Sequence, residues 1–413
     1  MDNEAADVGQ FELAIGQPHG QSTTDEGRGS RFRLRAKRVA EIAALHADVV
    51  DREGRFPQEA VDAMRAEGLL GMQIPRSLGG DGASLWDLAN VSVMLGGACA
   101  SSAMIFAMHQ TKTASLVSHA IDAPWHRGLM RRISSEQLLI ASSTTEKGIG
   151  GDLRHSICGL VCNNQTFRLE KDAPVISYGA EADLILATCR RSEDATSSDQ
   201  VLVALEKDSY TLTRYHAWDA MGMRGTRSDG FKLSATGDLQ QVLPKPFSEI
   251  AAQSMLATSH LLWSSVWLGM AWQAISKVHQ SLLQLARRDS GSIPFGSDRL
   301  SDAKRSYQTM KAEIEWALAL TADNRGSSPA HAAAFNNLKI SCSERLLSII
   351  NDSIMAIGIS AFQNGGELSL SRILRDAQSA QLMISNDRIR GNLMGLTLLS
   401  KAKGHLDHLE LEA

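Results

Sequence analysis

Residues 140–152 read IASSTTEKGIGGD and separate a helical first third of the chain from a strand-rich middle. Small hydroxyl residues lead into Glu146, and Gly148, Gly150 and Gly151 follow it. Glycines lack a Cβ, so the backbone can approach a flat or anionic group closely. A Gly/Ser/Thr-rich connector between domains has a similar composition. By itself, the stretch therefore predicts either a cofactor site or a linker between domains.

Composition limits the classes of protein to consider. A chain of 413 residues predicts two or three domains, and 43% hydrophobic with 21% charged residues is typical of a soluble globular protein. The formal net charge of −4 gives no basic surface for nucleic acid. The acidic N-terminus has no apolar signal region, and no apolar run is long enough to cross a membrane. We expect a cytoplasmic protein.

The five cysteines predict no metal site. Cys158 and Cys162 are four residues apart, but no second pair and no nearby histidine pattern completes a zinc site. Free thiols in a reducing compartment are the expected state.

The hydrophobic period changes twice along the chain and predicts four segments. Residues 1–30 are polar and predict a disordered or loosely ordered leader. Residues 31–140 predict a helical domain, residues 141–245 a β domain, and residues 246–413 a helical bundle. Short β-prone runs fill the middle: 166–170, 182–188, 201–205 and 230–233. Long helices are predicted afterwards: 255–285, 300–322, 330–357 and 370–403.

Four motifs, in this order, resemble the acyl-CoA dehydrogenase superfamily over about residues 35–400. The first combines Phe56-Pro57, Gly68-Leu69 and the loop 75–82; the second, TEKGIGGD at 145–152, is similar to TEPGAGSD. The third, WDAMGMRGTRS at 218–228, contains MGxRG, and the fourth is Arg372 with RDA at 375–377. The resemblance implies an α+β, acyl-CoA dehydrogenase-like fold. It would have an N-terminal helical domain, a small β-barrel or sandwich, and a C-terminal four-helix bundle.

The resemblance also implies an FAD enzyme that forms a homodimer or homotetramer. Hydroxyls near the flavin ring are expected from four residues: Ser143, Thr144, Thr145 and Ser177. The arginine that meets the pyrophosphate in the family falls on Ser292, three residues before Phe295-Gly296. Arg287, Arg288 and Arg299 are alternatives; we take Phe295 and Arg299 as cofactor-binding candidates. Gly151 and Arg224 are the substrate-binding candidates.

Departures from the family motifs affect its chemistry. The glutamate that removes the substrate α-proton lies nine residues after the RDA arginine, where this chain has Ile384. Some members of the family place that base at a second position, which corresponds to residues 258–262 here, and these residues contain no carboxylate. Replacement bases would be Asp387, His260 or His109; a surface ion pair of Asp387 with Arg388 or Arg390, and a hydrogen-bonded core histidine at 109, are the alternatives. Gly151 also replaces the usual serine, and Val175 a frequent tryptophan.

Three functions remain open. The first is desaturation of the CH–CH group of an acyl thioester or acyl-like substrate, with an electron-transfer flavoprotein as partner; family frequency places it narrowly ahead. The second is a two-component monooxygenase, which uses O2 and reduced FMN or FAD from a flavin reductase and needs no α-proton base. The third is a homologue that binds flavin or acyl groups without turnover.

Overall fold

A helical N-terminal domain begins the computed structural model, which describes residue 15 and residues 23–288, 292–322 and 328–399. Its helices are α1 (Thr23–Glu53), α2 (Gln58–Ala66), α3 (Leu85–Gly96), α4 (Ala100–His119) and α5 (Pro124–Glu136). A capping box fixes the start of α3, where Ser84 and Asp87 exchange hydrogen bonds. Small and apolar residues bury α4 on nearly all sides, so α4 lies at the centre of the domain.

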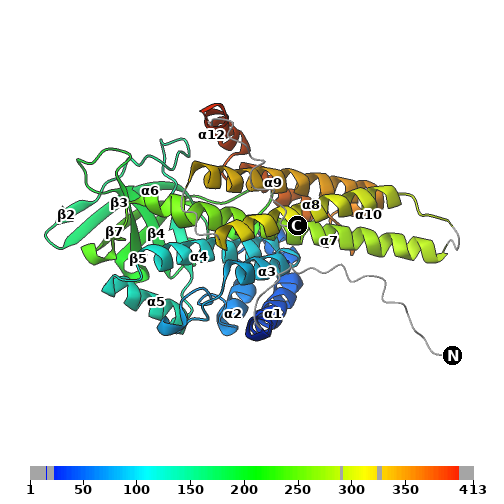
Figure 1. Ribbon diagram of the computed structural model, residues 1–413, viewed down its shortest axis with the longest axis horizontal. Helices are drawn as coiled ribbons and strands as arrows, with labels where there is room; N and C mark the ends of the chain where they lie inside the picture. Colours follow the sequence, from blue (N-terminus) through cyan, green and yellow to red (C-terminus); the bar gives the residue numbers. More distant parts are fainter. Residues whose placement is uncertain (1–14, 16–22, 289–291, 323–327, 400–413) are drawn as a thin grey trace, which may run out of the picture.

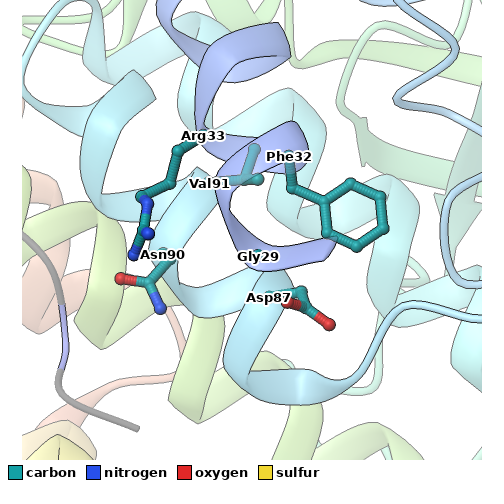
Figure 2. Close-up of a pocket in the computed structure, with 6 residues that line it drawn as sticks. All are labelled: Gly29, Phe32, Arg33, Asp87, Asn90 and Val91. Carbon is teal, nitrogen blue, oxygen red and sulfur yellow. The ribbon is translucent and has the colours of Figure 1, made fainter. Parts of the chain in front are cut away.

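The expected leader is wrong for residues 23–30, which belong to α1. The backbone N–H of Ile15 also donates to Asn90 Oδ1 at 2.8 Å, and Ile15 is buried. Figure 2 shows α1 against α3 here, with Arg33 beside Asn90; Phe32 also lines this pocket of about 10 Å³. A space of that size holds one water at most, so this contact is packing and not a ligand site. Residues 1–14 and 16–22 lie outside the described residues.

The middle of the chain folds into two sheets that pack as a small sandwich. One sheet has the order β1-β4-β5 and the other β2-β3-β7-β6. Their strands are β1 (Ile140–Ser143), β2 (Val161–Asn163), β3 (Thr166–Ile176), β4 (Leu184–Arg190), β5 (Gln200–Glu206), β6 (Tyr210–His216) and β7 (Asp229–Asp238). β1 runs parallel to β4, whereas the other pairs are antiparallel. Alternating buried residues of β3, such as Leu169 and Ala173, join those of β4 and β5 in one core.

Long helices form the C-terminal bundle, as predicted. They are α7 (Leu256–Arg288), α8 (Ser297–Ala322), α9 (Pro329–Ile357) and α11 (Ser371–Leu382), with the short helices α6 (Phe247–Ile250) and α10 (Ile359–Phe362) beside them. Figure 1 shows the strands at one end of the molecule and α7 to α9 running towards the other. The expected helix over 370–403 is broken: Ile384 adopts φ +49°, and α12 (Asn386–Leu399) leaves in a new direction. Residues 400–403 lie outside the described part.

The third and fourth motifs meet where the β domain contacts α11. Met223 N–H donates to Asp376 Oδ1 at 2.6 Å. A Cβ on Gly222 would lie 2.1 Å from the carbonyl oxygen of Arg375, so only glycine permits this approach. In the described part of the chain, no helix is long and apolar enough to cross a membrane.

Replacing Gly222 by alanine should destabilise the protein by about 1–3 kcal/mol, because the new methyl group overlaps the α11 backbone. Urea unfolding measures this change. Gly128→Ala in α5 is the matched control. Its Cβ would meet nothing within 4 Å, and a helical alanine should raise the free energy of unfolding by about 0.5–1 kcal/mol. Equal stability of Gly222→Ala and the parent would contradict the close packing of the two motifs.

Candidate functional site

The end of strand β1 carries a buried hydroxyl group with no partner. β1 pairs with β4 up to Ser143, which lies opposite Ala187. Ser143 is fully buried, and its Oγ has no hydrogen-bond partner among the described residues. Burying a hydroxyl without a partner costs free energy that a bound polar group would recover. This strand end is therefore a candidate place for a polar ligand.

The ends of β1 and β3 meet at this point. Thr145 Oγ1 donates to the Val175 carbonyl at 2.9 Å, two residues before Ser177. The hydroxyls of Ser177 and Ser228 are 2.8 Å apart, which ties the end of the third motif to the same edge. The structure thus places Ser143, Thr144 and Thr145 at the end of β1, against the end of the strand that leads to Ser177.

Glu146 fixes the loop that follows the hydroxyl run. Its carboxylate accepts hydrogen bonds from Ser156 Oγ at 2.8 Å, from Ile157 N–H at 2.9 Å and from Cys158 N–H at 2.6 Å. Burial by itself raises the pKa of Glu146, but these hydrogen bonds and the nearby Lys171 charge outweigh it and hold the pKa below its ordinary value. The ionised Glu146 thus fixes the position of residues 156–158. These residues were not predicted from the sequence to belong to the site, because they lie outside the motif.

The glycines that follow Glu146 lie against helix α12. Gly148, Gly150 and Gly151 all adopt positive φ. Arg388 donates hydrogen bonds to the carbonyls of Gly150 and Gly151, at 2.5 Å to the latter. A Cβ at position 151 would lie 2.6 Å from Arg388 Nη1. The glycine that replaces the family's serine therefore makes room for a guanidinium group, a contact that was not predicted.

The turn between α11 and α12 is built around a lysine. Ile384, where the resemblance places the catalytic base, turns its carbonyl inward, and Lys339 Nζ donates to it at 2.9 Å. Lys339 also donates to Asn386 Oδ1 at 2.7 Å and is fully buried on α9. Burial lowers the pKa of Lys339 to about 8. A lone lysine between Leu338 and Ile340 was the one sequence signal for this group.

Two of the three proposed replacement bases are occupied in other ways. Asp387 has a side chain that is 93% exposed and pairs with Arg390 at 3.4 Å, which is the surface ion pair that the sequence offered as the alternative. His260 is buried between α7 and α9, and its Nδ1 lies 3.2 Å from the Phe335 carbonyl. Burial lowers the pKa of His260 to about 4, so its ring is neutral near pH 7.

The third replacement base, His109, is a core histidine. Its Nε2 lies 2.7 Å from the Leu70 carbonyl and its Nδ1 accepts from Ile140 N–H at 3.1 Å. The carbonyl needs a donor and the N–H an acceptor, so the neutral ring carries its proton on Nε2. Burial lowers the pKa of His109 to about 4. Both ring nitrogens are thus used to join the N-terminal helices to β1.

The predicted pyrophosphate contacts, Phe295 and Arg299, lie elsewhere. Both belong to the α7–α8 connection and the start of α8, at the end of the bundle away from the strands (Figure 1). Phe295 is 88% exposed, and Arg299 pairs with Asp352 of α9 at 2.9 Å. Within the described chain, neither residue has a hydrogen bond or ion pair with the β domain. If Phe295 or Arg299 contacts a cofactor, that contact lies away from the hydroxyl residues at the end of β1 in this protomer.

Arg224, predicted to bind substrate, lines a cavity of about 850 Å³ between α1, α7 and α11. Its Nε donates to the Asp51 carbonyl at 2.7 Å and its Nη1 to the Ala220 carbonyl at 2.9 Å. Arg375 of the RDA motif pairs with the Asp51 carboxylate across the same cavity. Arg224 therefore connects the third motif to α1, and none of its hydrogen bonds reaches the Gly148–Gly151 segment.

Comparison with known proteins confirms the resemblance stated from the sequence. Residues 29–123 match the family model of the acyl-CoA dehydrogenase N-terminal domain. The amino sugar nitrososynthase DnmZ of Streptomyces peucetius is 26% identical over 81% of this chain and 84% of its own. Cyclohex-1-ene-1-carbonyl-CoA dehydrogenase of Geobacter metallireducens is 23% identical over 91% of this chain and 98% of its own.

Solved structures share the fold over nearly the whole chain. A nitrososynthase from Micromonospora carbonacea var. africana has a TM-score of 0.78 and 18% identity, covering 94% of this chain and 100% of its own. FMN-bound TdsC from Paenibacillus sp. A11-2 has a TM-score of 0.72 and 18% identity, covering 89% and 97%. The acyl-CoA dehydrogenase-like fold predicted from the sequence is confirmed.

Replacing Glu146 by glutamine should destabilise the protein by about 1.5–3 kcal/mol at pH 7, because three hydrogen bonds lose a charged acceptor. The folded pKa of Glu146 is lowered, so its contribution is present above the ordinary value of 4.5 and is lost as pH falls through the folded pKa. Urea unfolding at several pH values should therefore show the parent–variant difference shrinking below about pH 4.

The control for this substitution is Glu170→Gln on β3. Glu170 pairs with Arg168, but its side chain is 54% exposed, so its loss should change stability by less than about 0.5 kcal/mol. A parent–Glu146→Gln difference that stays constant from pH 7 to pH 3 would show that the carboxylate charge is not what holds the loop.

Proposed function

We propose that this chain, which has the acyl-CoA dehydrogenase fold, is the oxygenase component of a two-component flavin-dependent monooxygenase. The observation that carries the proposal is the α11–α12 turn, where Lys339 binds the carbonyl of Ile384 at the position of the family's base. Removal of an α-proton needs a base within hydrogen-bond reach of the substrate. Ile384 has no group that accepts a proton, and Lys339 holds its carbonyl in the turn, whereas oxygenation of the substrate does not require such a base.

The residues present fit a flavin. The unpartnered Ser143 hydroxyl would donate to an acceptor atom of the ring, with Thr145 and Ser177 beside it. The left-handed glycines would let the backbone approach the ring or its phosphate without a Cβ in the way. When bound, reduced flavin supplies the two electrons with which O2 is split, so one oxygen atom enters the substrate and the other leaves as water. A separate flavin reductase would provide those electrons.

The protein's own residues would then bind the substrate and keep water out. Glu146 holds the loop 156–158 in place, and Lys339 on α9 holds the α11–α12 turn through the Ile384 carbonyl. These contacts fix both walls of the site before a ligand arrives, which lowers the entropy cost of binding. The similarity to a nitrososynthase over 81% of the chain supports a small substrate that presents a nucleophilic atom, such as an amine nitrogen.

Desaturation of an acyl thioester is the second candidate. The similarity to cyclohex-1-ene-1-carbonyl-CoA dehydrogenase over 98% of that enzyme supports it, and an electron-transferring flavoprotein would be the partner. This reaction would require a base from outside the set of Asp387, His260 and His109, because each of these already has another contact. The two candidates therefore differ in the fate of O2 and of the substrate α-proton.

The oxygen reaction separates the two candidates. Flavin-loaded protein, reduced without oxygen and then mixed with oxygenated buffer in a stopped-flow instrument, should show an additional absorbance phase before the oxidised spectrum appears. With the reductase and an amine substrate, ¹⁸O from labelled O2 should enter the product. A single slow reoxidation, together with α-proton exchange of an acyl thioester in ²H2O, would instead establish the dehydrogenase.

Replacing Asp387 by asparagine should leave turnover within about twofold of the parent, because this carboxylate is exposed and paired with Arg390. Steady-state rates over pH 6–9 measure the effect. A loss of a hundredfold or more, with unchanged flavin affinity, would instead identify Asp387 as the base and favour the dehydrogenase.

A further inference from the structure

We propose that Arg388 is a phosphate-binding residue at the glycine segment. This role rests on the proposed function in one respect: the ligand would be the flavin or the substrate of that site. From the sequence, Arg388 is expected only as an alternative to Arg390 as the ion-pair partner of Asp387. In the structure, Asp387 pairs with Arg390 instead. The proposal combines the charge of Arg388, the absence of a side chain at Gly151, and the support beneath the turn.

The charge of Arg388 is not neutralised within the described chain. Its Nη1 and Nη2 donate to the carbonyls of Gly151 and Gly150, and no described carboxylate lies within 4.0 Å of its guanidinium nitrogens. Two of its five N–H donors are thereby used, and the side chain is exposed. The neighbouring Arg390, in contrast, pairs with both Glu344 and Asp387. Arg388 is thus a positioned cation with free donors.

Gly151 and Arg388 are coupled. A Cβ at position 151 would approach Arg388 Nη1 to 2.6 Å and Nη2 to 3.4 Å. The serine that usually stands at this position in the family signature would displace the guanidinium. Where the family signature has a neutral serine hydroxyl, this chain therefore has the charged guanidinium of Arg388.

A second cation supports the same turn. Lys339 lies beneath it and binds the Ile384 carbonyl and Asn386 Oδ1. Its charge is also 6.0 Å from the centroid of the Trp267 ring, which stabilises a buried ammonium. Asn386 begins α12, so the positive end of that helix dipole points to the turn as well. Lys339 and the start of α12 thus add positive charge next to Arg388, while the nearby carboxylates of Asp387 and Glu344 are both paired with Arg390.

The chemistry of a guanidinium specifies the kind of anion. Its planar donors match two oxygens of a phosphate group, and such charge-assisted bonds are stronger than neutral ones. Two sources supply a phosphate at this site: the flavin itself, and a substrate carried on a nucleoside diphosphate or on coenzyme A. The same recognition applies to both, and the experiment below separates them.

Binding of defined probes to Arg388→Gln, compared with the parent, tests the proposal. The flavin source is tested by titrating apoprotein with FMN and with riboflavin, which lacks the phosphate. The substrate source is tested by calorimetric titration of flavin-loaded protein with thymidine diphosphate, coenzyme A and inorganic pyrophosphate. We expect Kd to rise about tenfold to a hundredfold for at least one phosphate-bearing probe, and Kd for riboflavin to stay unchanged.

The pattern of losses identifies the source. Weaker FMN binding with unchanged diphosphate binding assigns Arg388 to the flavin phosphate, and the reverse pattern assigns it to the substrate. Affinities for all phosphate probes within twofold of the parent, or no binding of any probe by the parent, would overturn the proposal and leave Arg388 as a contact that only holds the glycine segment. None of these readouts depends on oxygenation, so they stand even if the proposed reaction is wrong.

Two further variants serve as controls. Arg390→Gln removes a charge two residues away that is already paired, so phosphate affinity should remain within twofold of the parent. Gly151→Ala should lower phosphate affinity as Arg388→Gln does, because its methyl group crowds the guanidinium and its positive φ strains the glycine segment while the charge remains in the chain. Unchanged affinity in Gly151→Ala, with a thermal unfolding midpoint equal to the parent's, would contradict the coupling of the two residues.

Discussion

The hydrogen bond from Met223 N–H to the buried Asp376 carboxylate couples the two parts of the chain that carry the candidate site residues. It joins the connection between β6 and β7 to α11, and α11 leads through the turn at Ile384 into α12, which carries Arg388. Burial raises the pKa of Asp376 to about 6, although the charge of Arg372 opposes that rise. Because Gly222 lets the backbone of α11 approach to contact distance, the junction is rigid.

The two parts that this junction couples differ in their electrostatics. On the side of the β domain, Glu146 uses its negative charge to order backbone N–H groups. On the side of the bundle, Lys339 and Arg388 use positive charge to order backbone carbonyls. A carboxylate at position 384 would belong to the residue whose carbonyl accepts from Lys339, and the attraction of that cation would lower its pKa and weaken it as a base. The absence of glutamate and the presence of Lys339 are therefore consistent with one another.

The fold could be predicted because local signals agree with it. The changes of hydrophobic period, the glycines and the four motifs each depend on a few neighbouring residues. The start of α1 was missed because polar residues 23–30 have no apolar stripe, and the break at Ile384 was missed because a non-glycine residue with positive φ leaves no local signature. Phe295 and Arg299 were assigned by position relative to a motif across an insertion, and their contact with a cofactor stays a prediction.

The candidate site was less predictable because its new contacts are distant in sequence. Arg388 and Gly151 are 237 residues apart, and Lys339 and Ile384 are 45 apart, so no periodicity links them. From the motif alone, a glycine in place of serine reads as the loss of a substrate contact. With the guanidinium against it, the same glycine is the condition for a new contact, since a larger residue would push Arg388 away. A departure from a family motif is thus best interpreted together with the group that occupies the space it leaves.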